Sequence, residues 1–139
     1  MSDKAFVDSN LWLYAFALRP GEEVRHERAK ALIEAPVRYT ISEQVIAEVS
    51  NNLLKKAQMQ EDRLLAIVES FYVRCQVVAP DIVTHRAAGR LRQAYRFSYW
   101  DSLIVAAALE TGCSILYSED MQHRLEIDSR LTILNPLIA

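Results

Sequence analysis

Cysteine and glycine are both scarce in this sequence of 139 residues. The two cysteines, Cys75 and Cys113, each lie in an apolar stretch. They provide neither a disulfide scaffold nor a cysteine-rich zinc site, and they suit a reducing cytoplasm. With only three glycines, at positions 21, 89 and 112, neither a Walker-type phosphate loop nor a G-x-G-x-x-G dinucleotide motif is possible. Nucleotide cofactors that bind through such loops are therefore excluded.

Long apolar runs and a strong net charge are also absent. The longest uninterrupted apolar runs span residues 11–18 and 103–109, far short of the roughly 20 residues that a membrane-spanning helix needs. The first residues, Met-Ser-Asp-Lys, lack the basic-then-apolar pattern of a secretion signal, so we expect a cytoplasmic protein. The net charge is −2, and any contact with nucleic acid must come from local basic patches or a bound cation.

The composition and the pattern of the chain predict one α/β domain. Apolar residue types make up 51% of the sequence, and no linker, repeat or low-complexity tract divides residues 1–139. Short apolar segments predict strands at 5–7, 37–41, 75–79, 114–117 and 131–134. Helical periodicity predicts helices at 11–18, 22–35, 43–57, 61–73, 81–95 and 99–111, with Ser42 and Asp81 as N-caps. This alternation favours a central, mostly parallel five-stranded sheet covered on both faces, a three-layer α/β/α sandwich.

Four of the 18 acidic residues stand out because of their neighbours. Asp8 directly follows the first predicted strand, and Asp120 follows the fourth. Asp101 lies in the first turn of an apolar helix, and Glu48 lies at the margin of the apolar stripe of helix 43–57. Each has an ordinary structural explanation when taken alone: a helix cap, a favourable charge at a helix start, or an exposed helix position.

Taken together, Asp8, Glu48, Asp101 and Asp120 indicate a metal site. The carboxyl ends of parallel strands and the starts of the following helices meet at one edge of a sheet, where ligands bind. Two unit charges about 4 Å apart repel by ~4 kcal/mol at an effective dielectric of about 20, so such a cluster requires a cation. Carboxylate oxygens without Cys or His select Mg²⁺ or Mn²⁺, and such an ion suits phosphoryl chemistry.

Basic residues precede Asp101 along the chain. No acid lies between Ile82 and Trp100, and the arginines of this stretch occupy one polar arc of the predicted helix: Arg86, Arg90, Arg92 and Arg96. These arginines either form a solvated helix face or bind a phosphate backbone near the metal.

Four segments, in this order, resemble a PIN domain: FVDSN at 6–10, SEQVIAE at 42–48, YWDSLIVAAA at 99–108 and ILYSED at 115–120. The resemblance covers essentially the whole chain, and a free-standing PIN domain of this size resembles the VapC-type toxins of toxin–antitoxin pairs. It implies a Mg²⁺- or Mn²⁺-dependent endoribonuclease, a homodimer, and a small antitoxin encoded beside it.

The resemblance also implies residue roles. The family's acidic quartet falls on Asp8, Glu48, Asp101 and Asp120, and its supporting polar positions fall on Ser9, Asn10 and Ser118. Many members carry a further acid two residues beyond the fourth, where this chain has Gln122. Whether Glu119 or Asp120 provides the fourth acid therefore stays open.

The resulting hypothesis is metal-dependent hydrolysis of single-stranded or looped RNA. Asp8 and Asp101 would bind the metal, Asp120 would complete the site, and Glu48 would hold or deprotonate a water molecule. An alternative is a non-catalytic PIN-fold module that binds RNA or a protein. A phospho-acceptor receiver domain fits less well, because paired acids after the first strand and a lysine after the last strands are absent.

The first predicted helix is rich in aromatic residues. It carries Trp12, Tyr14 and Phe16, which either form a homodimer surface or pack in the core of the domain.

Overall fold

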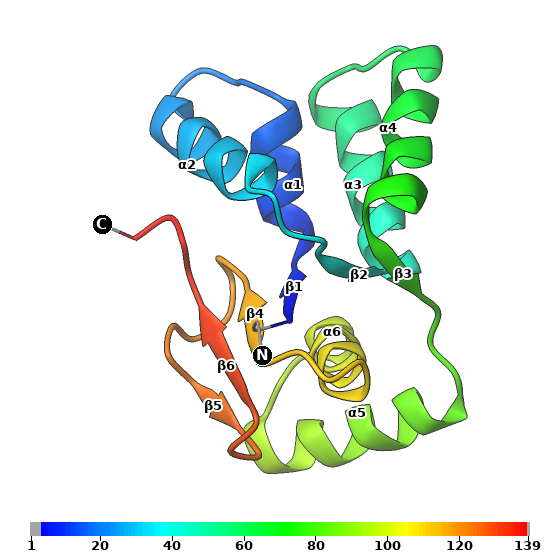
Figure 1. Ribbon diagram of the computed structural model, residues 1–139, viewed down its shortest axis with the longest axis vertical. Coiled ribbons are helices and arrows are strands. Elements are labelled where there is room, and N and C mark those ends of the chain that lie inside the picture. Colours follow the sequence, from blue (N-terminus) through cyan, green and yellow to red (C-terminus); the bar gives the residue numbers. More distant parts are fainter. Residues whose placement is uncertain (1–3, 139) are drawn as a thin grey trace.

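The computed structural model describes residues 4–138, and its elements alternate as the sequence predicts (Figure 1). The strands are β1 (Ala5–Val7), β2 (Thr40–Ser42), β3 (Gln76–Val78), β4 (Ile115–Tyr117), β5 (Glu126–Ile127) and β6 (Leu131–Leu134). The helices are α1 (Ser9–Phe16), α2 (Glu23–Glu34), α3 (Glu43–Lys56), α4 (Glu61–Arg74), α5 (Ile82–Tyr95) and α6 (Tyr99–Glu110). The predicted α/β class is confirmed.

The strands form one sheet in the order β3-β2-β1-β4-β6-β5. Neighbouring strands are parallel, except that β5 pairs antiparallel with β6. The described chain thus has a six-stranded sheet, and the predicted count of five is wrong by one. β5 is only two residues long, and its turn uses left-handed backbone at Asp128 (φ 52°) and Ser129 (φ 54°). Sequence reasoning misses this hairpin because neither residue is the Gly or Asn that signals such a turn.

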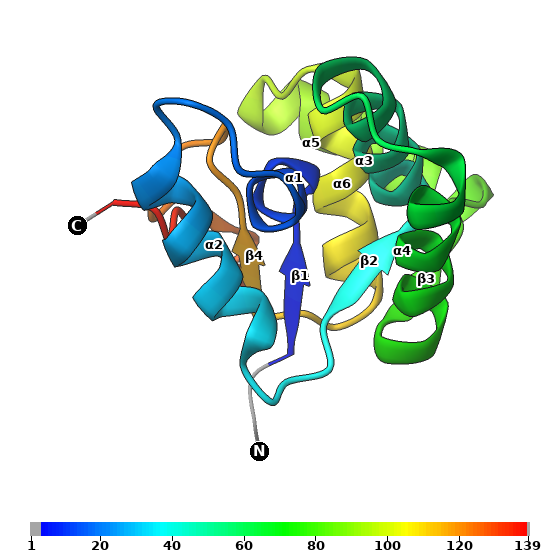
Figure 2. The same ribbon diagram turned by 90° about the horizontal axis from the view of Figure 1, so that it is seen from above.

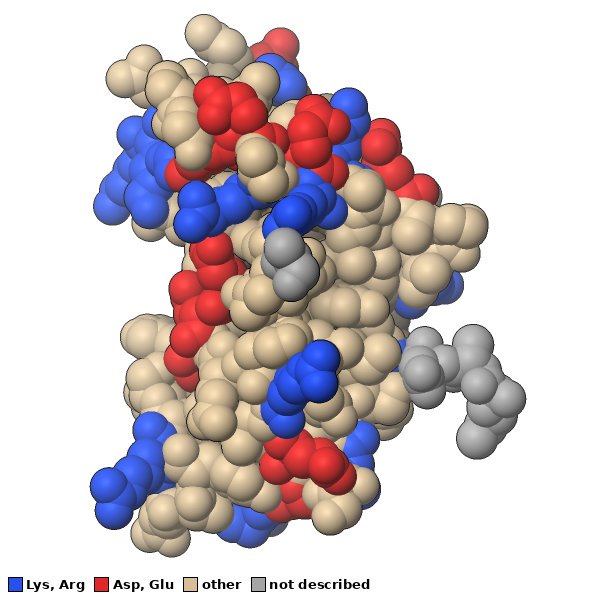
Figure 3. All heavy atoms as spheres, turned by 90° about the vertical axis from the view of Figure 1, so that its left-hand side faces the viewer, with Lys and Arg blue, Asp and Glu red and all other residues tan. Residues whose placement is uncertain are grey.

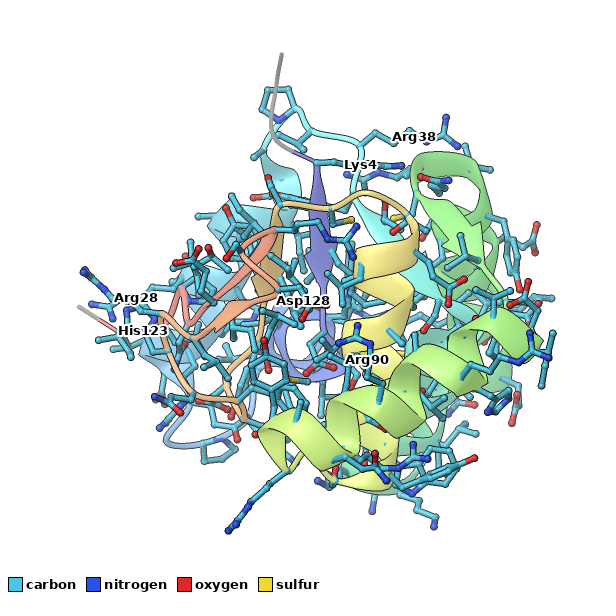
Figure 4. All side chains as sticks on the ribbon, turned by 90° about the horizontal axis from the view of Figure 1, so that it is seen from below. Lys4, Arg28, Arg38, Arg90, His123 and Asp128 are labelled. Atoms are coloured by element: carbon cyan, nitrogen blue, oxygen red, sulfur yellow. The ribbon has the colours of Figure 1, made fainter. Side chains whose placement is uncertain are left out.

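Helices cover both faces of the sheet, which confirms the predicted three layers. α1 and α2 lie over the face turned toward the viewer in Figure 2, and α5 and α6 lie over the opposite face, seen in Figure 4. α6 contacts β2 and β4, and its residues 102–109 are all buried. This double cover explains why β1 is buried at every position and shows no polar alternation. Within the described residues, no helix is long and apolar enough to span a membrane.

The sheet has a topological switch point between β1 and β4. From β1 the chain moves to β2 and β3 on one side, and it returns to β4 on the other side of β1. In sheets of this kind, ligands bind in the crevice at the carboxyl ends of the strands that flank the switch point. Val7 of β1 lies opposite Tyr117 of β4, so the next residues, Asp8 and Ser118, leave the sheet as neighbours.

Local hydrogen bonds set the helix starts around this crevice. α1 begins at Ser9, two residues before the predicted start, because the Asp8 side chain accepts a hydrogen bond from the Ser9 N–H. α5 begins after Asp81, as predicted, with a reciprocal capping box between Asp81 and Thr84. Ser42 precedes α3 at the predicted N-cap position, but its side chain makes no capping hydrogen bond.

Two of the three aromatic residues of α1 pack in the core: Trp12 is buried, and the partly buried Phe16 packs against the core. Trp12 is 4% exposed and lies against Phe16 and Phe71, with ring centroids 6.1 Å and 5.0 Å away. Tyr14 uses its hydroxyl to donate to Glu119 at 2.8 Å. Core packing therefore accounts for Trp12 and Phe16, and the homodimer stays a prediction.

Candidate active site

The carboxyl ends of β1 and β4 bring Asp8 and Ser118 into direct contact. The Asp8 N–H donates to the carbonyl of Tyr117 at 2.9 Å, and the Ser118 hydroxyl donates to Asp8 Oδ2 at 2.9 Å. The Ser9 N–H donates to the other carboxylate oxygen, Oδ1, at 2.7 Å. Two donors from two different segments therefore fix the orientation of the Asp8 carboxylate.

Asp8 is a buried acid, with only 5% of its surface exposed. Its pKa is raised from 3.8 to about 6, mainly by burial, with smaller contributions to this rise from the Glu48 and Asp101 carboxylates. The hydrogen bonds from Ser9 and Ser118 act in the opposite direction. A carboxylate in such a place is costly to ionise at neutral pH unless a positive charge compensates it.

Ser9 connects Asp8 to Glu48, which reaches the site from α3. The Ser9 hydroxyl lies 3.2 Å from Glu48 Oε1 and 3.3 Å from Asp8 Oδ1. Because a hydroxyl has one proton, it donates to one carboxylate at a time. Burial raises the pKa of the half-buried Glu48, and the charges of Asp101 and Asp120 raise it further.

Asp101 faces the other three acids from the first turn of α6. Its N–H donates to the Ser98 hydroxyl at 3.1 Å, which caps the helix and fixes this turn. Burial raises the pKa of Asp101, and its own charge raises the pKa of Asp8, Glu48 and Asp120. The four predicted acids thus lie near enough for their charges to act on one another; we call Asp8, Glu48, Asp101 and Asp120 the acid cluster.

Asp120 and the adjacent Glu119 have different partners. Asn10 Nδ2 donates to Asp120 Oδ2 at 2.6 Å, and burial raises the pKa of Asp120. Glu119 instead accepts from the Tyr14 hydroxyl at 2.8 Å and pairs with Arg25 at 3.1 Å. The charge of Glu119 is therefore compensated within the fold, and the geometry favours Asp120 as the fourth acid.

No ion pair within residues 4–138 includes a member of the acid cluster. The ion pairs there join Arg19 to Glu22, Arg25 to Glu119 and Arg90 to Asp128. The negative charge of the acid cluster therefore has no positively charged side chain as an ion-pair partner among these residues. The chemistry of the cluster, all hard oxygens, therefore fits a divalent cation such as Mg²⁺ or Mn²⁺.

The spacing of the acids limits the kind of cation that they could hold. In the described part of the chain, no three His, Cys, Asp or Glu side chains stand close enough together to enclose a metal ion. Mg²⁺ rarely needs such a cage, because it keeps several water molecules and binds one or two carboxylates directly. The cluster therefore fits a partly hydrated ion.

The four predicted phosphate-contacting arginines divide into two groups. Arg90 pairs with Asp128 at 2.7 Å, and Figure 4 shows the two side chains near each other below the sheet. Arg92 donates to the Ser102 hydroxyl at 2.8 Å. Arg86 and Arg96 are exposed and make no side-chain hydrogen bond or ion pair within residues 4–138. The face in Figure 3 likewise intersperses basic and acidic side chains instead of presenting one basic patch.

Sequence reasoning missed a cavity that adjoins the acid cluster. It has a volume of about 660 Å³, and its lining includes Glu48, Gln44, Tyr99 and Trp100. The available signal was the pair of large aromatic residues directly before Asp101, Tyr99 and Trp100.

Comparison with known proteins identifies the family of this chain. The sequence model of the family described as PIN domain matches residues 5–127. No curated protein is significantly similar in sequence.

Solved structures resemble the fold over nearly its whole length. A toxin–antitoxin complex from Klebsiella pneumoniae contains a chain with TM-score 0.72 and 22% identity, over 96% of this chain and 98% of that one. Mycobacterium tuberculosis VapC20, described as a Sarcin-Ricin loop cleaving toxin, has TM-score 0.66 and 19% identity, over 84% and 90% of the two chains. DNA-bound VapBC from Salmonella typhimurium has TM-score 0.65 and 20% identity, over 95% and 97%. At these identities the likeness establishes the fold.

Proposed function

Since this chain belongs to the PIN domain family, we propose that it is a Mg²⁺- or Mn²⁺-dependent endoribonuclease and the toxin of a toxin–antitoxin pair. One observation carries the proposal: the buried Asp8 carboxylate lies near two further acids, Glu48 and Asp101, and forms no ion pair within residues 4–138. A fold gains nothing from this repulsion unless a cation binds there. A cation at the acid cluster would compensate the phosphate charge and lower the pKa of a bound water molecule.

The residues of the cluster take distinct roles in this proposal. Asp8 and Asp101 would hold the cation, and Asp120 would complete the site. Ser118 and Ser9 fix the two oxygens of Asp8, as their hydrogen bonds indicate. These supports keep the Asp8 ligand in one orientation before the substrate arrives.

Glu48 is the candidate proton acceptor. It is half-buried, its pKa is raised by burial, and Ser9 holds one of its oxygens at 3.2 Å. A carboxylate with a raised pKa is a stronger base than an exposed one and accepts a proton from the attacking water. The water oxygen bonds to phosphorus, the P–O3′ bond breaks, and the O3′ atom takes up a proton. The products carry a 5′-phosphate and a 3′-hydroxyl.

The toxin assignment is supported by two of the similar structures, a toxin–antitoxin complex from Klebsiella pneumoniae and the toxin VapC20. VapC20 is described as cleaving the Sarcin-Ricin loop, and we propose single-stranded or looped RNA in the cytoplasm as the substrate of this chain. We also propose a small antitoxin as the protein partner and a homodimer as the assembly.

A cleavage assay with the purified chain tests this function. Labelled single-stranded RNA is incubated with Mg²⁺ or Mn²⁺, and the new ends are identified by their susceptibility to a 5′-phosphate-dependent exonuclease. We expect cleavage that stops in EDTA and returns when the metal is added back. Undiminished cleavage in EDTA, or products with a 5′-hydroxyl, would contradict the proposal.

A further inference from the structure

The cavity beside the acid cluster lies between α3, the start of α5 and the first turn of α6. Its volume is about 660 Å³, within the range of sites that bind small organic groups. The lining residues that matter here are Gln44, Glu48, His85, Tyr99 and Trp100. Glu48 belongs both to this lining and to the acid cluster, so the cavity and the proposed active site share a wall.

Two aromatic side chains line this cavity and remain accessible. Trp100 is 60% exposed and Tyr99 is 48% exposed, whereas residues 102–109 of the same helix are all buried. The two rings meet edge to face, with centroids 5.0 Å apart and planes at 87°. Large aromatic surfaces are strongly stabilised by burial, so a pair left in the open next to an active site indicates a binding surface.

The two rings are held by the fold although they are exposed. The Trp100 carbonyl accepts a hydrogen bond from Gln44 Nε2 at 3.3 Å, which ties the first turn of α6 to α3. The guanidinium of Arg92 lies over the Tyr99 ring, 5.2 Å from its centroid. The Arg92 side chain is itself anchored on Ser102 at 2.8 Å. An aromatic surface that is fixed before binding loses little conformational entropy when a flat group stacks on it.

The occupant must reach both the aromatic rings and the acids. Trp100 directly precedes Asp101, and the shared Glu48 lines the cavity, so one molecule touches both regions. A nucleic acid strand carries a flat base and a phosphate in every residue, which matches this pairing. Arg86 and Arg96 are exposed on the segments that lead to Tyr99, and they offer positive charge to the flanking phosphates.

We infer that an unpaired base of the RNA substrate stacks on Trp100 in this cavity while its neighbouring phosphate lies at the acid cluster. This inference rests on the proposed function for the identity of the acid cluster. It also specifies the substrate: a base inside a duplex cannot expose its face to Trp100, so the bound strand must be single-stranded or looped.

Tryptophan fluorescence tests the stacking directly, because the chain has two tryptophans in opposite environments. Trp12 is 4% exposed and donates to the Val7 carbonyl at 3.1 Å, whereas Trp100 is 60% exposed. The Trp12→Phe variant leaves Trp100 as the only indole, and the Trp100→Phe variant leaves Trp12. The wild-type chain is titrated as well, so the result does not depend on the folding of Trp12→Phe.

The titrations are carried out with excess Mg²⁺ and with RNA whose phosphodiesters are replaced by hydrolysis-resistant phosphorothioates, so that the acid cluster carries its cation while cleavage is suppressed. Short single-stranded RNA should quench the emission of wild type and Trp12→Phe but not that of Trp100→Phe. A fully paired RNA duplex and inorganic polyphosphate, which offers charge without bases, should leave all three emissions nearly unchanged. Equal quenching by polyphosphate, or no quenching by single-stranded RNA, would overturn the inference.

Binding affinity gives a second, independent readout. Trp100→Ala should weaken binding of single-stranded RNA by roughly 5- to 150-fold, the range expected for loss of one base–aromatic stack. Trp100→Phe should retain most of the affinity. Tyr72→Ala is the matched control, because Tyr72 is an aromatic residue of α4 that is 55% exposed and does not line this cavity. Equal affinities of Trp100→Ala and wild type would overturn the inference.

The two proposals fail in distinguishable ways. If RNA quenches Trp100 but the wild type cleaves no RNA with Mg²⁺ or Mn²⁺, the nuclease function fails and the stacking site stands. If the wild type cleaves RNA while Trp100→Ala binds it equally well, the stacking site fails and the function stands. An emission that responds to the cognate antitoxin but not to RNA would assign the cavity to a protein partner and overturn the inference.

Discussion

The two edges of the parallel sheet use their charged side chains in opposite ways. At the amino edge, Lys4 donates to the carbonyl of Thr111 at 2.8 Å, and Arg38 donates to the carbonyl of Cys75 at 3.4 Å. Figure 4 shows Lys4 and Arg38 together at this end of the sheet. At the carboxyl edge, Asp8 is buried and Asp101 raises its pKa, but no ion pair within residues 4–138 includes either acid.

The charged groups at the amino edge stabilise the fold, whereas those at the carboxyl edge destabilise it. Thr111 caps the carboxyl end of α6, where a cation is favourable, so Lys4 stabilises the fold. The acids at the other edge raise one another's pKa, so their charges oppose folding when nothing compensates them. Because the acids at the carboxyl edge destabilise the fold, this edge is a strong candidate for a binding site.

The largest expected effect is on cleavage by Asp8→Asn and Asp101→Asn. Each variant keeps the shape of the side chain and removes one negative charge from the proposed cation site. Cleavage of single-stranded RNA should fall by at least about a hundredfold, as on loss of one charge-stabilising group in an active site. Initial rates with Mn²⁺ measure the effect, and circular dichroism checks the fold. Wild-type cleavage rates in both variants would mean that the acids at the carboxyl edge have no role in cleavage.

The second prediction concerns stability without metal. Burial raises the pKa of Asp8 to about 6 from 3.8, so the folded state binds this proton more tightly than the unfolded chain does. Its stabilising contribution is complete below pH 3.8 and is lost as the pH rises through about 6. Asp8→Asn should therefore stabilise the metal-free protein at pH 8 by up to about 3 kcal/mol, with no gain at low pH.

Urea denaturation in EDTA at a series of pH values measures this difference. A variant that is less stable than wild type at pH 8 would mean that the hydrogen bonds from Ser9 and Ser118 outweigh the cost of burying the charge.

The gathering of the acids was predictable because it depends on chain direction. Asp8 and Asp120 follow strands, and Asp101 begins a helix, so a parallel α/β fold brings them to one edge whatever the details of packing. The partners of long side chains were not predictable in this way. Arg90 meets Asp128 only because the β5–β6 turn approaches α5, and this turn was itself missed. Likewise, pairing of Glu119 with Arg25 depends on how α2 packs.

The third prediction separates the adjacent acids Asp120 and Glu119. Asp120 belongs to the acid cluster, whereas Glu119 is held by Tyr14 and Arg25. Asp120→Asn should lower cleavage by roughly 10- to 100-fold, and Glu119→Gln by less than about tenfold through a loosened loop. Rates at saturating Mn²⁺ make the comparison. The reverse order would move the fourth acid to Glu119.

The fourth prediction compares arginines with and without a partner in the fold. Arg86 is exposed, whereas Arg90 pairs with Asp128 at 2.7 Å. Arg86→Ala should weaken RNA binding in EDTA and reduce the slope of log K against log salt by about 1, and Arg90→Ala should change it less. Fluorescence anisotropy at several salt concentrations gives both slopes. Equal slopes for wild type and Arg86→Ala would exclude a phosphate contact.

The smallest expected effect on cleavage comes from the amino edge. Lys4→Met removes the hydrogen bond to Thr111 and should cost about 1 kcal/mol of stability. Its cleavage rate should equal that of wild type, because the residue lies at the opposite end of the strands from the acids. A lost rate in a folded Lys4→Met variant would show that the two edges are not functionally separate.

Calorimetric titration of the metal-free protein with Mn²⁺ tests the central claim most directly. We predict binding by wild type and Lys4→Met that strengthens from pH 5 to pH 7.5, because burial raises the pKa of Asp8 to about 6 and the metal competes with protons. Asp8→Asn should lose this binding. Absence of binding in wild type, or unchanged binding in Asp8→Asn, would contradict the claim that the carboxyl edge is a cation site.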